Sequence, residues 1–310
     1  MSISYDKKKL LLYHKIYEHI LEHPFSSMKS ISHKIGVSRS IISLSIEEMK
    51  ARKILIGPYL SINSAQNYSQ YMHFIKFSDP EMIYQGLKSI PHLISHYHCF
   101  GDWNLLIITD IPLDFSHLAG FEDCIYRAKK INSVTLKAPF TSWEKAFAKM
   151  HSIRDHRQHE NHPLLPAQSI LPWGKAQWNL YHSFRKDVRI TIAPVLKKLH
   201  IPYDTFKEWK TSLGDTCSIL TEFYPEGANS YLNYLFLFKK CDDCMKEILA
   251  CLPTTVTFIR VDGDDDLIAS IKVANPGAIR ELLGMFSNMK PTFFESLSSA
   301  VILKGCYHWL

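Results

Sequence analysis

Apolar residues recur every three to four positions through the first fifty residues, a spacing that predicts helices. The first helix contains the apolar positions between Leu10 and Leu21 and is expected to stop before Pro24. A second helix over 28–35 is expected to be capped by Ser27 and ended by Gly36. A third, over 39–52 and capped by Ser38, buries three apolar side chains: Ile42, Ile46 and Met49.

Two short β runs separated by Gly57 and Pro58 follow these helices in 54–62. Two helices joined by a short turn form a helix-turn-helix. A two-stranded flap after it makes the unit a winged helix. The pattern therefore predicts a winged helix-turn-helix over residues 1–64.

The remainder of the first half alternates between strands and helices. Strands are expected at 71–77, 93–100, 103–110 and 133–138, with helices at 79–87 and 115–130. The turn between the second and third strands is made by Gly101 and Asp102. This order is the ferredoxin-like βαββαβ arrangement, expected over residues 65–145.

The same pattern returns about 163 positions later, which indicates an internal duplication. Segments 30–37, 71–77 and 101–105 correspond to 194–201, 234–240 and 263–267. The fold class predicted is therefore α+β, a tandem repeat of a winged helix-turn-helix plus a ferredoxin-like domain. A polar linker is expected over 146–173, then a second, degenerate winged helix over 174–226 and a second ferredoxin-like domain over 227–310.

Composition and charge fit a mildly basic globular protein. The chain has 310 residues, 46% of them hydrophobic, with a formal net charge of +6. No apolar run approaches the roughly 18 residues of a membrane span. The N-terminal segment has no long apolar region like that of a signal peptide. With seven scattered cysteines, these features favour a cytoplasmic protein with reduced thiols and no membrane partner.

The winged helix over 31–56 and the Gly-Asp-aromatic turn at 101–105 resemble the Lrp/AsnC family of leucine-responsive, feast/famine regulators. The resemblance covers nearly all of the first half and, more weakly, the second, so two fused units are expected where family members usually have one. It implies a DNA-binding transcription regulator that is not an enzyme. It also implies a homodimer through the ferredoxin-like domains and a small-molecule effector, such as an amino acid, near the turn.

Candidate site residues follow from that resemblance. Arg39 suits guanine recognition, and serines of the third helix suit base edges or phosphates, while flanking cations suit the DNA backbone. The expected DNA-binding residues are Arg39, Ser40, Ser43, Lys29, Lys34, Lys50, Arg52 and Lys53. The expected effector-binding residues are Gly101, Asp102, Trp103 and Asn104. In the second unit Asp204 and Glu208 disfavour phosphate, so its winged helix is expected to serve packing.

Three further motifs are interpreted as structural, with no metal and no cofactor. The lone pair Cys241 and Cys244 lacks a second pair for zinc. His151, His156, His159 and His162 lie in a linker that fixes no geometry. The aspartates of 262–266 align with the Gly101 turn and are expected to form a hairpin.

Two other functions stay open. A tetrapyrrole decarboxylase of the siroheme type shares this architecture with paired units, and its site could use His96, His98 and Tyr97. The other alternative is an adaptor that binds proteins and not DNA.

Overall fold

The computed structural model describes residues 7–155, 170–263 and 265–308. Its first helices are α1 (Lys7–Glu22), α2 (Met28–Ile35) and α3 (Arg39–Ala51), as predicted. The predicted caps are confirmed, because the hydroxyls of Ser27 and Ser38 accept N–H groups in the first turns of α2 and α3. Gly36 ends α2 in the left-handed conformation, with φ +80°.

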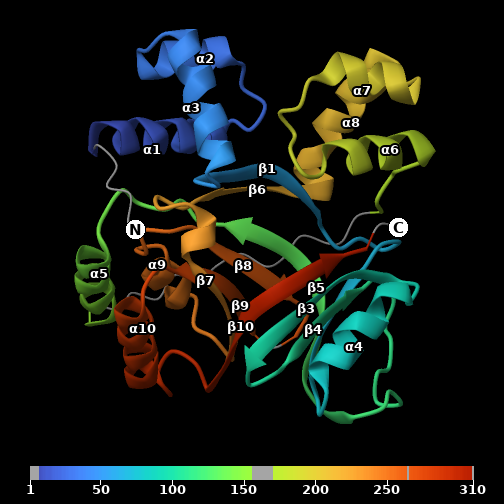
Figure 1. The fold of residues 1–310 in the computed structure, drawn as a ribbon, viewed down its shortest axis with the longest axis vertical. Helices are drawn as coiled ribbons and strands as arrows, with labels where there is room; N and C mark the ends of the chain where they lie inside the picture. The colour runs from blue at the N-terminus through green and yellow to red at the C-terminus, as the bar shows by residue number, and fades with distance from the viewer. Residues whose placement is uncertain (1–6, 156–169, 264, 309–310) are drawn as a thin grey trace.

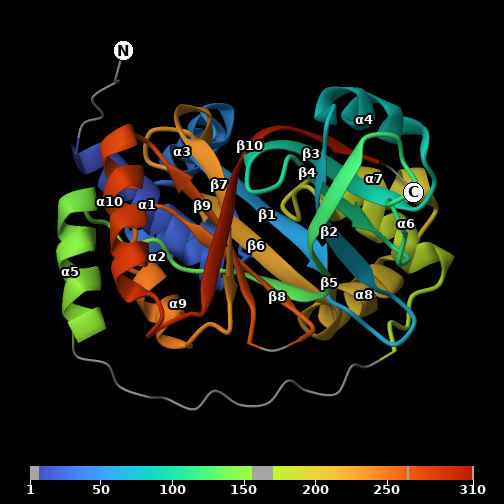
Figure 2. The same ribbon diagram turned by 90° about the horizontal axis from the view of Figure 1, so that it is seen from below.

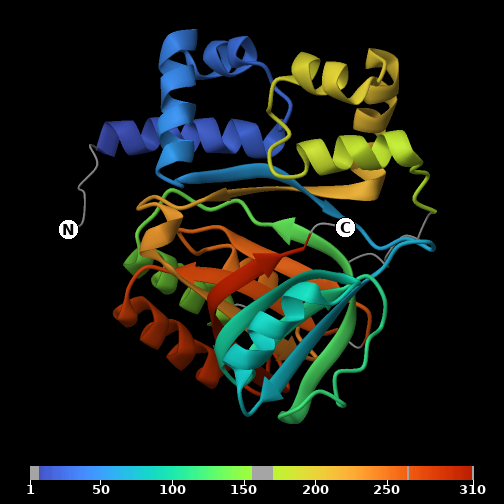
Figure 3. The ribbon, with the colours of Figure 1, turned by 45° about the vertical axis from the view of Figure 1, so that its right-hand side comes forward.

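A second module of three helices lies beside the first (Figure 3). It consists of α6 (Lys175–Phe184), α7 (Ile192–Leu199) and α8 (Tyr203–Thr216). His200 ends α7 in the left-handed conformation, at the position that corresponds to Gly36. The two helical modules therefore repeat the same local design.

The wing predicted over 54–62 is wrong. The two runs form a single strand, β1 (Leu55–Ile62), which pairs antiparallel with β6 (Cys217–Phe223) of the second module. The break at Gly57 is an irregularity within this ladder, where a Cβ would lie 2.6 Å from the Leu220 carbonyl oxygen. Pairing across the modules satisfies backbone groups that a free flap would leave to water.

Further contacts lock the helical modules together. The Leu60 amide donates to the Arg185 carbonyl, and the Val188 amide donates to the Pro58 carbonyl. The Arg189 guanidinium donates to the carbonyls of Pro24 and Ser26 at 3.1 and 2.8 Å. The two modules and the β1–β6 ribbon therefore form one layer.

Below this layer, eight strands close into a barrel (Figure 1). The first half supplies β2 (Gln70–Phe77), β3 (Leu93–Gly101), β4 (Leu105–Thr109) and β5 (Phe121–Thr135). The second half supplies β7 (Leu232–Lys239), β8 (Val256–Val261), β9 (Leu267–Val273) and β10 (Ser296–Tyr307). The order around the barrel is β10-β3-β4-β2-β5-β8-β9-β7, and β7 pairs with β10 to close it.

The helix predicted over 115–130 is wrong, because β5 occupies most of that range. This strand pairs with β2 on one side and β8 on the other, so strand pairing on both edges decides its conformation. The second half does have a helix at the corresponding place, α10 (Pro276–Met289). The mixed α and β architecture is confirmed, but the halves differ in their helices.

Helices cover opposite sides of the barrel (Figure 2). On one side α4 (Pro80–Gly86), followed by a short 3-10 turn (Leu87–Ser89), packs over the first half. On the other side lie α9 (Cys244–Leu249), α10 and α5 (Trp143–Asp155). A short 3-10 turn (Ala228–Ser230) leads from β6 into β7. Within the part of the chain described, no helix has both the length and the apolar character needed to cross a bilayer.

The barrel has two places where a strand of one half pairs with a strand of the other. We name them the β3–β10 seam and the β5–β8 seam. The barrel interior is filled by apolar side chains of both halves, including Phe74, Trp103, Leu237 and Ile268. The halves therefore share one core.

Candidate functional site at the β3–β10 seam

Titratable side chains gather on the outer face of the β3–β10 seam, beside α4. In the antiparallel register Cys306 lies opposite His96 and Lys304 lies opposite His98. Because side chains alternate along a strand, these four share one face. Three more residues complete the cluster: Glu81 and Tyr84 from α4, and His308 just after β10.

His96 is buried and held by two hydrogen bonds. Its Nε2 lies 2.9 Å from the Tyr84 carbonyl oxygen, which can only accept, so Nε2 carries the proton. Its Nδ1 then accepts from Nε2 of His308 at 2.7 Å. Burial lowers the pKa of His96 to about 4 and also lowers the pKa of His308. Both imidazoles are therefore neutral near pH 7.

Closer to solvent, Glu81 joins a lysine and a histidine. Lys304 Nζ lies 2.7 and 2.6 Å from the two oxygens of Glu81, and His98 Nδ1 lies 3.2 Å from Oε2. The hydrogen bond from Lys304 is the main reason that the pKa of Glu81 falls to about 2. The ammonium also lies 4.7 Å from the Tyr84 ring centroid. Two of its three N–H groups meet Glu81, which leaves one for another anion.

The backbone of β10 sets which side chains face outward. The ladder skips Leu303 between Ile302 and Lys304. Next to it, Gly305 lies against the Tyr97 ring, where a Cβ would come within 2.6 Å of Cδ1. Tyr97 itself packs edge-on against Tyr307. Lys304 and Cys306 therefore point away from Tyr97, toward α4.

The predicted effector turn is filled by contacts within the chain. The Ser299 amide donates to Asp102 Oδ2 at 2.7 Å, and a Cβ on Gly101 would lie 2.4 Å from the Ser299 carbonyl oxygen. Trp103 is fully buried, and the Asn104 side chain bonds both backbone groups of Phe77. Effector binding at these four residues stays a prediction.

The predicted DNA-binding residues lie on α2, on α3 and just after α3. Arg39, Ser40, Lys29 and Lys34 are exposed, whereas the Ser43 hydroxyl bonds Glu47. Three of the cations already have partners: Lys50 pairs with Asp187, Arg52 with Glu48, and Lys53 with Asn229. Leu44 on the outer face of α3 is 65% exposed, whereas its neighbour Ser45 is buried.

The cysteine, histidine and aspartate motifs of the sequence lie on separate elements. Cys244 and Cys251 are buried thiols, Cys241 is half-buried, and none belongs to a potential metal cluster there. His151 lies at the end of α5, while His156, His159, His162 and Asp264 fall outside the described residues. Asp266 accepts the Tyr126 hydroxyl and the Lys240 amide, as suits a turn.

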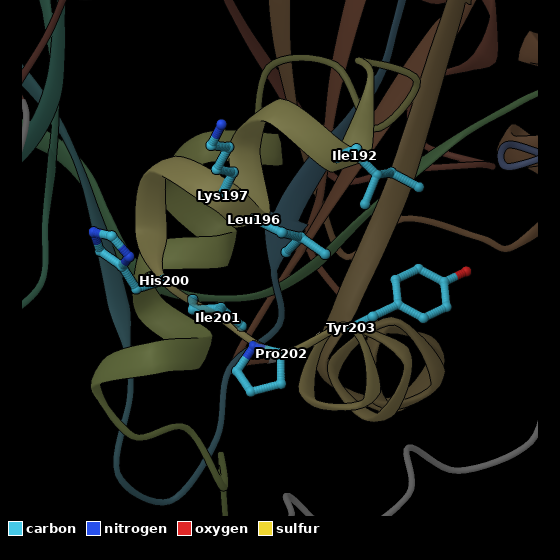
Figure 4. A pocket seen from close by; sticks show the side chains of 8 residues that line it. Ile192, Leu196, Lys197, His200, Ile201, Pro202 and Tyr203 are labelled. Atoms are coloured by element: carbon cyan, nitrogen blue, oxygen red, sulfur yellow. The ribbon is translucent and has the colours of Figure 1, made fainter.

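Two hollows lie away from the seam. One, of about 720 Å³, is lined by Ile192, Leu196, Ile201, Tyr203 and neighbours between α7 and α8 (Figure 4). The other, of about 460 Å³, lies between α1 and residues 137–140. Neither is lined by a residue of the seam cluster. Within that cluster the side chains of Glu81 and Lys304 are 50% and 41% exposed, whereas that of His98 is 17% exposed.

Comparison with known proteins gives structural neighbours only. No family model and no curated protein matches the chain. The siroheme decarboxylase NirDL is similar over 95% of this chain and 91% of its own, with 13% identity and a TM-score of 0.46. Its co-complex with an iron-uroporphyrin III analogue is similar over 95% of this chain and 92% of its own. The identity is 14% and the TM-score is 0.45. AsnC of E. coli is similar over 41% of this chain and 92% of its own, with 14% identity and a TM-score of 0.32.

The comparisons correct the expected function. The interpretation as a DNA-binding regulator that is not an enzyme is wrong, because the matches that run through both halves are with an enzyme, whereas the regulator spans less than half of the chain. Double-stranded DNA as a partner stays a prediction. In the structure β1 pairs with β6, and three of the expected DNA-contacting cations already have partners within the chain.

Sequence reasoning found part of the seam cluster and missed the rest. His96, His98 and Tyr97 were the residues named for the decarboxylase alternative, and the structure places all three on β3. Glu81 and Tyr84 of α4 were missed, as were Lys304, Cys306 and His308. The alternate spacing of the last three was a signal, but only the pairing of β10 with β3 shows that they face the histidines.

Proposed function

We propose that this chain decarboxylates an iron tetrapyrrole of the siroheme type at the β3–β10 seam. The observation that carries the proposal is the convergence of His98, Lys304 and Glu81 beside His96, on a face that is partly open. An acetate side chain offers a carboxylate, and the site offers an ammonium to bind it and an imidazole to exchange a proton. The neighbour NirDL is a siroheme decarboxylase whose co-complex holds an iron-uroporphyrin III analogue, which is the reason to try this ligand first.

The reaction needs a carboxylate anchor and a proton. When the bond between the methylene carbon and the carboxylate carbon breaks, CO2 leaves and the electron pair stays on the methylene carbon. That carbon takes up one proton and becomes a methyl group. Lys304 supplies the anchor through the N–H that Glu81 does not use. Because Glu81 holds His98 at Nδ1, Nε2 of His98 is the nitrogen that delivers the proton.

We also propose the finer architecture that this function requires. In each half the strand order is 4-1-3-2 when the strands are numbered along the chain, which supports two ferredoxin-like domains, the first lacking its second helix. The units are proposed at 1–64, 65–145, 174–226 and 227–310. The linker expected over 146–173 begins within α5, whose Phe147 and Met150 are buried, so its first ten residues are a packed helix and not an open connection. The three-helix modules support an origin from winged helices whose wing strands now pair with each other.

The test is anaerobic incubation of the full chain with siroheme, following the absorption spectrum and the loss of CO2 by mass spectrometry. The wild-type chain is expected to shift the spectrum and release CO2. His98→Asn is expected to lower turnover by roughly 100-fold or more, the usual contribution of a general acid, with binding retained. His92→Asn is the matched control, because His92 is exposed on a turn and pairs with Asp110 rather than with Glu81.

The proposal is wrong if wild-type protein neither shifts the tetrapyrrole spectrum nor releases CO2. It is also wrong if His98→Asn and His92→Asn turn over at the same rate. Circular dichroism of each variant confirms that the fold is intact.

A further inference from the structure

Three soft or borderline metal ligands converge beneath the open part of the seam cluster. His96, Cys306 and His308 each offer one ligand atom, and these atoms lie within 4.8 Å of one another. His96 comes from β3 of the first half, and the other two come from β10 and its end in the second half. Among the described residues no other group of three or more such side chains comes together in this way.

The orientation of His96 is that of a metal-ligating imidazole. Its Nε2–H donates to the Tyr84 carbonyl. The Tyr84 ring packs edge-on against the imidazole, with the two ring centroids 4.6 Å apart. A backbone carbonyl on the second ring nitrogen is the usual outer partner that fixes the ring and its tautomer in metal sites. It leaves the lone pair of Nδ1 directed at His308, and the side chain is fully buried. The first ligand is therefore already set.

The other two ligands need only small changes. The rings of His96 and His308 are stacked, with centroids 4.8 Å apart and 2.7 Å between the facing nitrogens. A cation at about 2.0–2.1 Å from each nitrogen and about 2.3 Å from sulfur would replace that hydrogen bond. His308 would then carry its proton on Nδ1, and the Cys306 thiol would release its proton to solvent. The His308 backbone amide is anchored on the Ile94 carbonyl, so its ring needs only to rotate.

We propose that His96, Cys306 and His308 bind one borderline divalent cation, of which Zn²⁺ is the best representative. Two imidazoles and one thiolate suit this class better than they suit Mg²⁺ or Ca²⁺, which take oxygen ligands. Three protein ligands leave a fourth position open, which is the arrangement of reactive sites rather than closed structural ones. This site goes beyond the proposed decarboxylase activity and does not depend on it.

The test uses Co²⁺ as a visible probe for the zinc site, with full-length protein free of any histidine tag and stripped by a chelator. One equivalent of Co²⁺ is expected to give visible d–d bands and a sulfur-to-cobalt charge-transfer band in the near ultraviolet. One equivalent of Zn²⁺ is expected to bleach both. No tetrapyrrole is present, so the result is independent of the proposed function.

Two cysteine variants separate this site from other thiols. Cys306→Ser is expected to lose the charge-transfer band and to weaken Co²⁺ binding by at least roughly 100-fold, since even outer partners of ligands change affinity by up to that much. Cys124→Ser is the matched control, because Cys124 is an exposed free thiol on β5. A His308→Ala variant tests the site without a change in any buried side chain.

The proposal is overturned if wild-type protein binds less than one equivalent of Co²⁺ or shows no sulfur charge-transfer band. It is equally overturned if Cys306→Ser keeps that band, or if Cys124→Ser loses it. Thermal melting of the variants in the absence of metal identifies any that fail to fold, in which case His308→Ala decides.

Discussion

The two seams of the barrel share one backbone register. Each ladder skips a single residue, Leu303 in the β3–β10 seam and Ile131 in the β5–β8 seam. When residue pairs are counted from the skipped residue, each pair of one seam has an equivalent pair in the other. The equivalent pairs are Ile302–Cys99 and Lys130–Val261, then Lys304–His98 and Asn132–Arg260, then Cys306–His96 and Val134–Phe258.

The side chains of the two seams differ at the positions of the candidate site. At the β5–β8 seam Phe258 is buried with Phe147 and Met150 of α5 and with residues of α9, so that seam is closed by apolar packing. At the β3–β10 seam the same place holds His96, and only the short helix α4 lies over it. The two seams therefore share a backbone register and differ in the side chains that they carry on the outer face.

The largest expected effect comes from giving β10 the residues that β5 has at the equivalent positions. The double variant is Lys304→Asn with Cys306→Val, and it leaves His96 and His98 of β3 unchanged. Turnover of siroheme is expected to fall by roughly 1000-fold, because both the carboxylate anchor and a polar neighbour of His96 are lost. Both changed side chains are partly exposed, so the fold is expected to persist. CO2 release measures the effect.

The matched change in the other seam is Val134→Ala, at a residue that is 44% exposed. It is expected to leave turnover unchanged. Equal losses in both variants would show that the seams contribute alike and would remove the distinction drawn between them.

Local patterns could be predicted from the sequence, whereas pairings between the halves could not. Capping serines and the positive-φ Gly36 act within a few residues, so the helices of the first module follow from spacing alone. The wing over 54–62 and the helix over 115–130 failed for one reason. In each case a partner strand from the other half, β6 or β8, decides the conformation. The candidate site followed the same rule: His96 and His98 could be named, but Lys304 faces them only through a contact more than two hundred residues away in sequence.

A second contrast concerns buried histidines. His73 on β2 corresponds to Phe236 on β7 under the 163-residue repeat, and His73 is 1% exposed. Burial, helped by the positive charge of Arg127, lowers the pKa of His73 to about 4. The unfolded chain has the ordinary value near 6.5, so it binds a proton that the folded chain does not between those pH values. Stability from this residue is therefore present above pH 6.5 and is lost as the pH falls toward 4.

Replacing His73 by Phe copies the second half and removes this titration. Wild-type protein is expected to lose about 3 kcal/mol more unfolding free energy than His73→Phe between pH 7 and pH 4. Urea unfolding at several pH values gives the difference, in which the other histidines cancel. Parallel pH curves for the two proteins would contradict the assignment. The Thr109 hydroxyl, which His73 contacts, keeps its bond to the Ile111 carbonyl in the variant.

The smallest expected effect concerns Lys130, which stands where the other seam has Ile302. Its ammonium is buried, and donates to Ser61 Oγ at 2.7 Å and to Gln70 Oε1 at 3.1 Å. Burial lowers the pKa of Lys130 to about 8, and the charge of a nearby Cys217 thiolate acts in the opposite direction.

Lys130→Ile removes a buried charge but also leaves two polar groups without this donor. We therefore expect a net gain of only about 1 kcal/mol in unfolding free energy at pH 7. Between pH 8 and 10.5 the folded wild-type lysine has lost its proton while the unfolded one keeps it. Wild-type stability therefore rises by about 2 kcal/mol between pH 7 and 9.5, and the variant becomes the less stable protein. Urea unfolding at pH 7 and pH 9.5 measures both values. An advantage that grows with pH would mean that Lys130 is stabilised as a cation by its surroundings, and that the two seams differ there in charge and not only in packing.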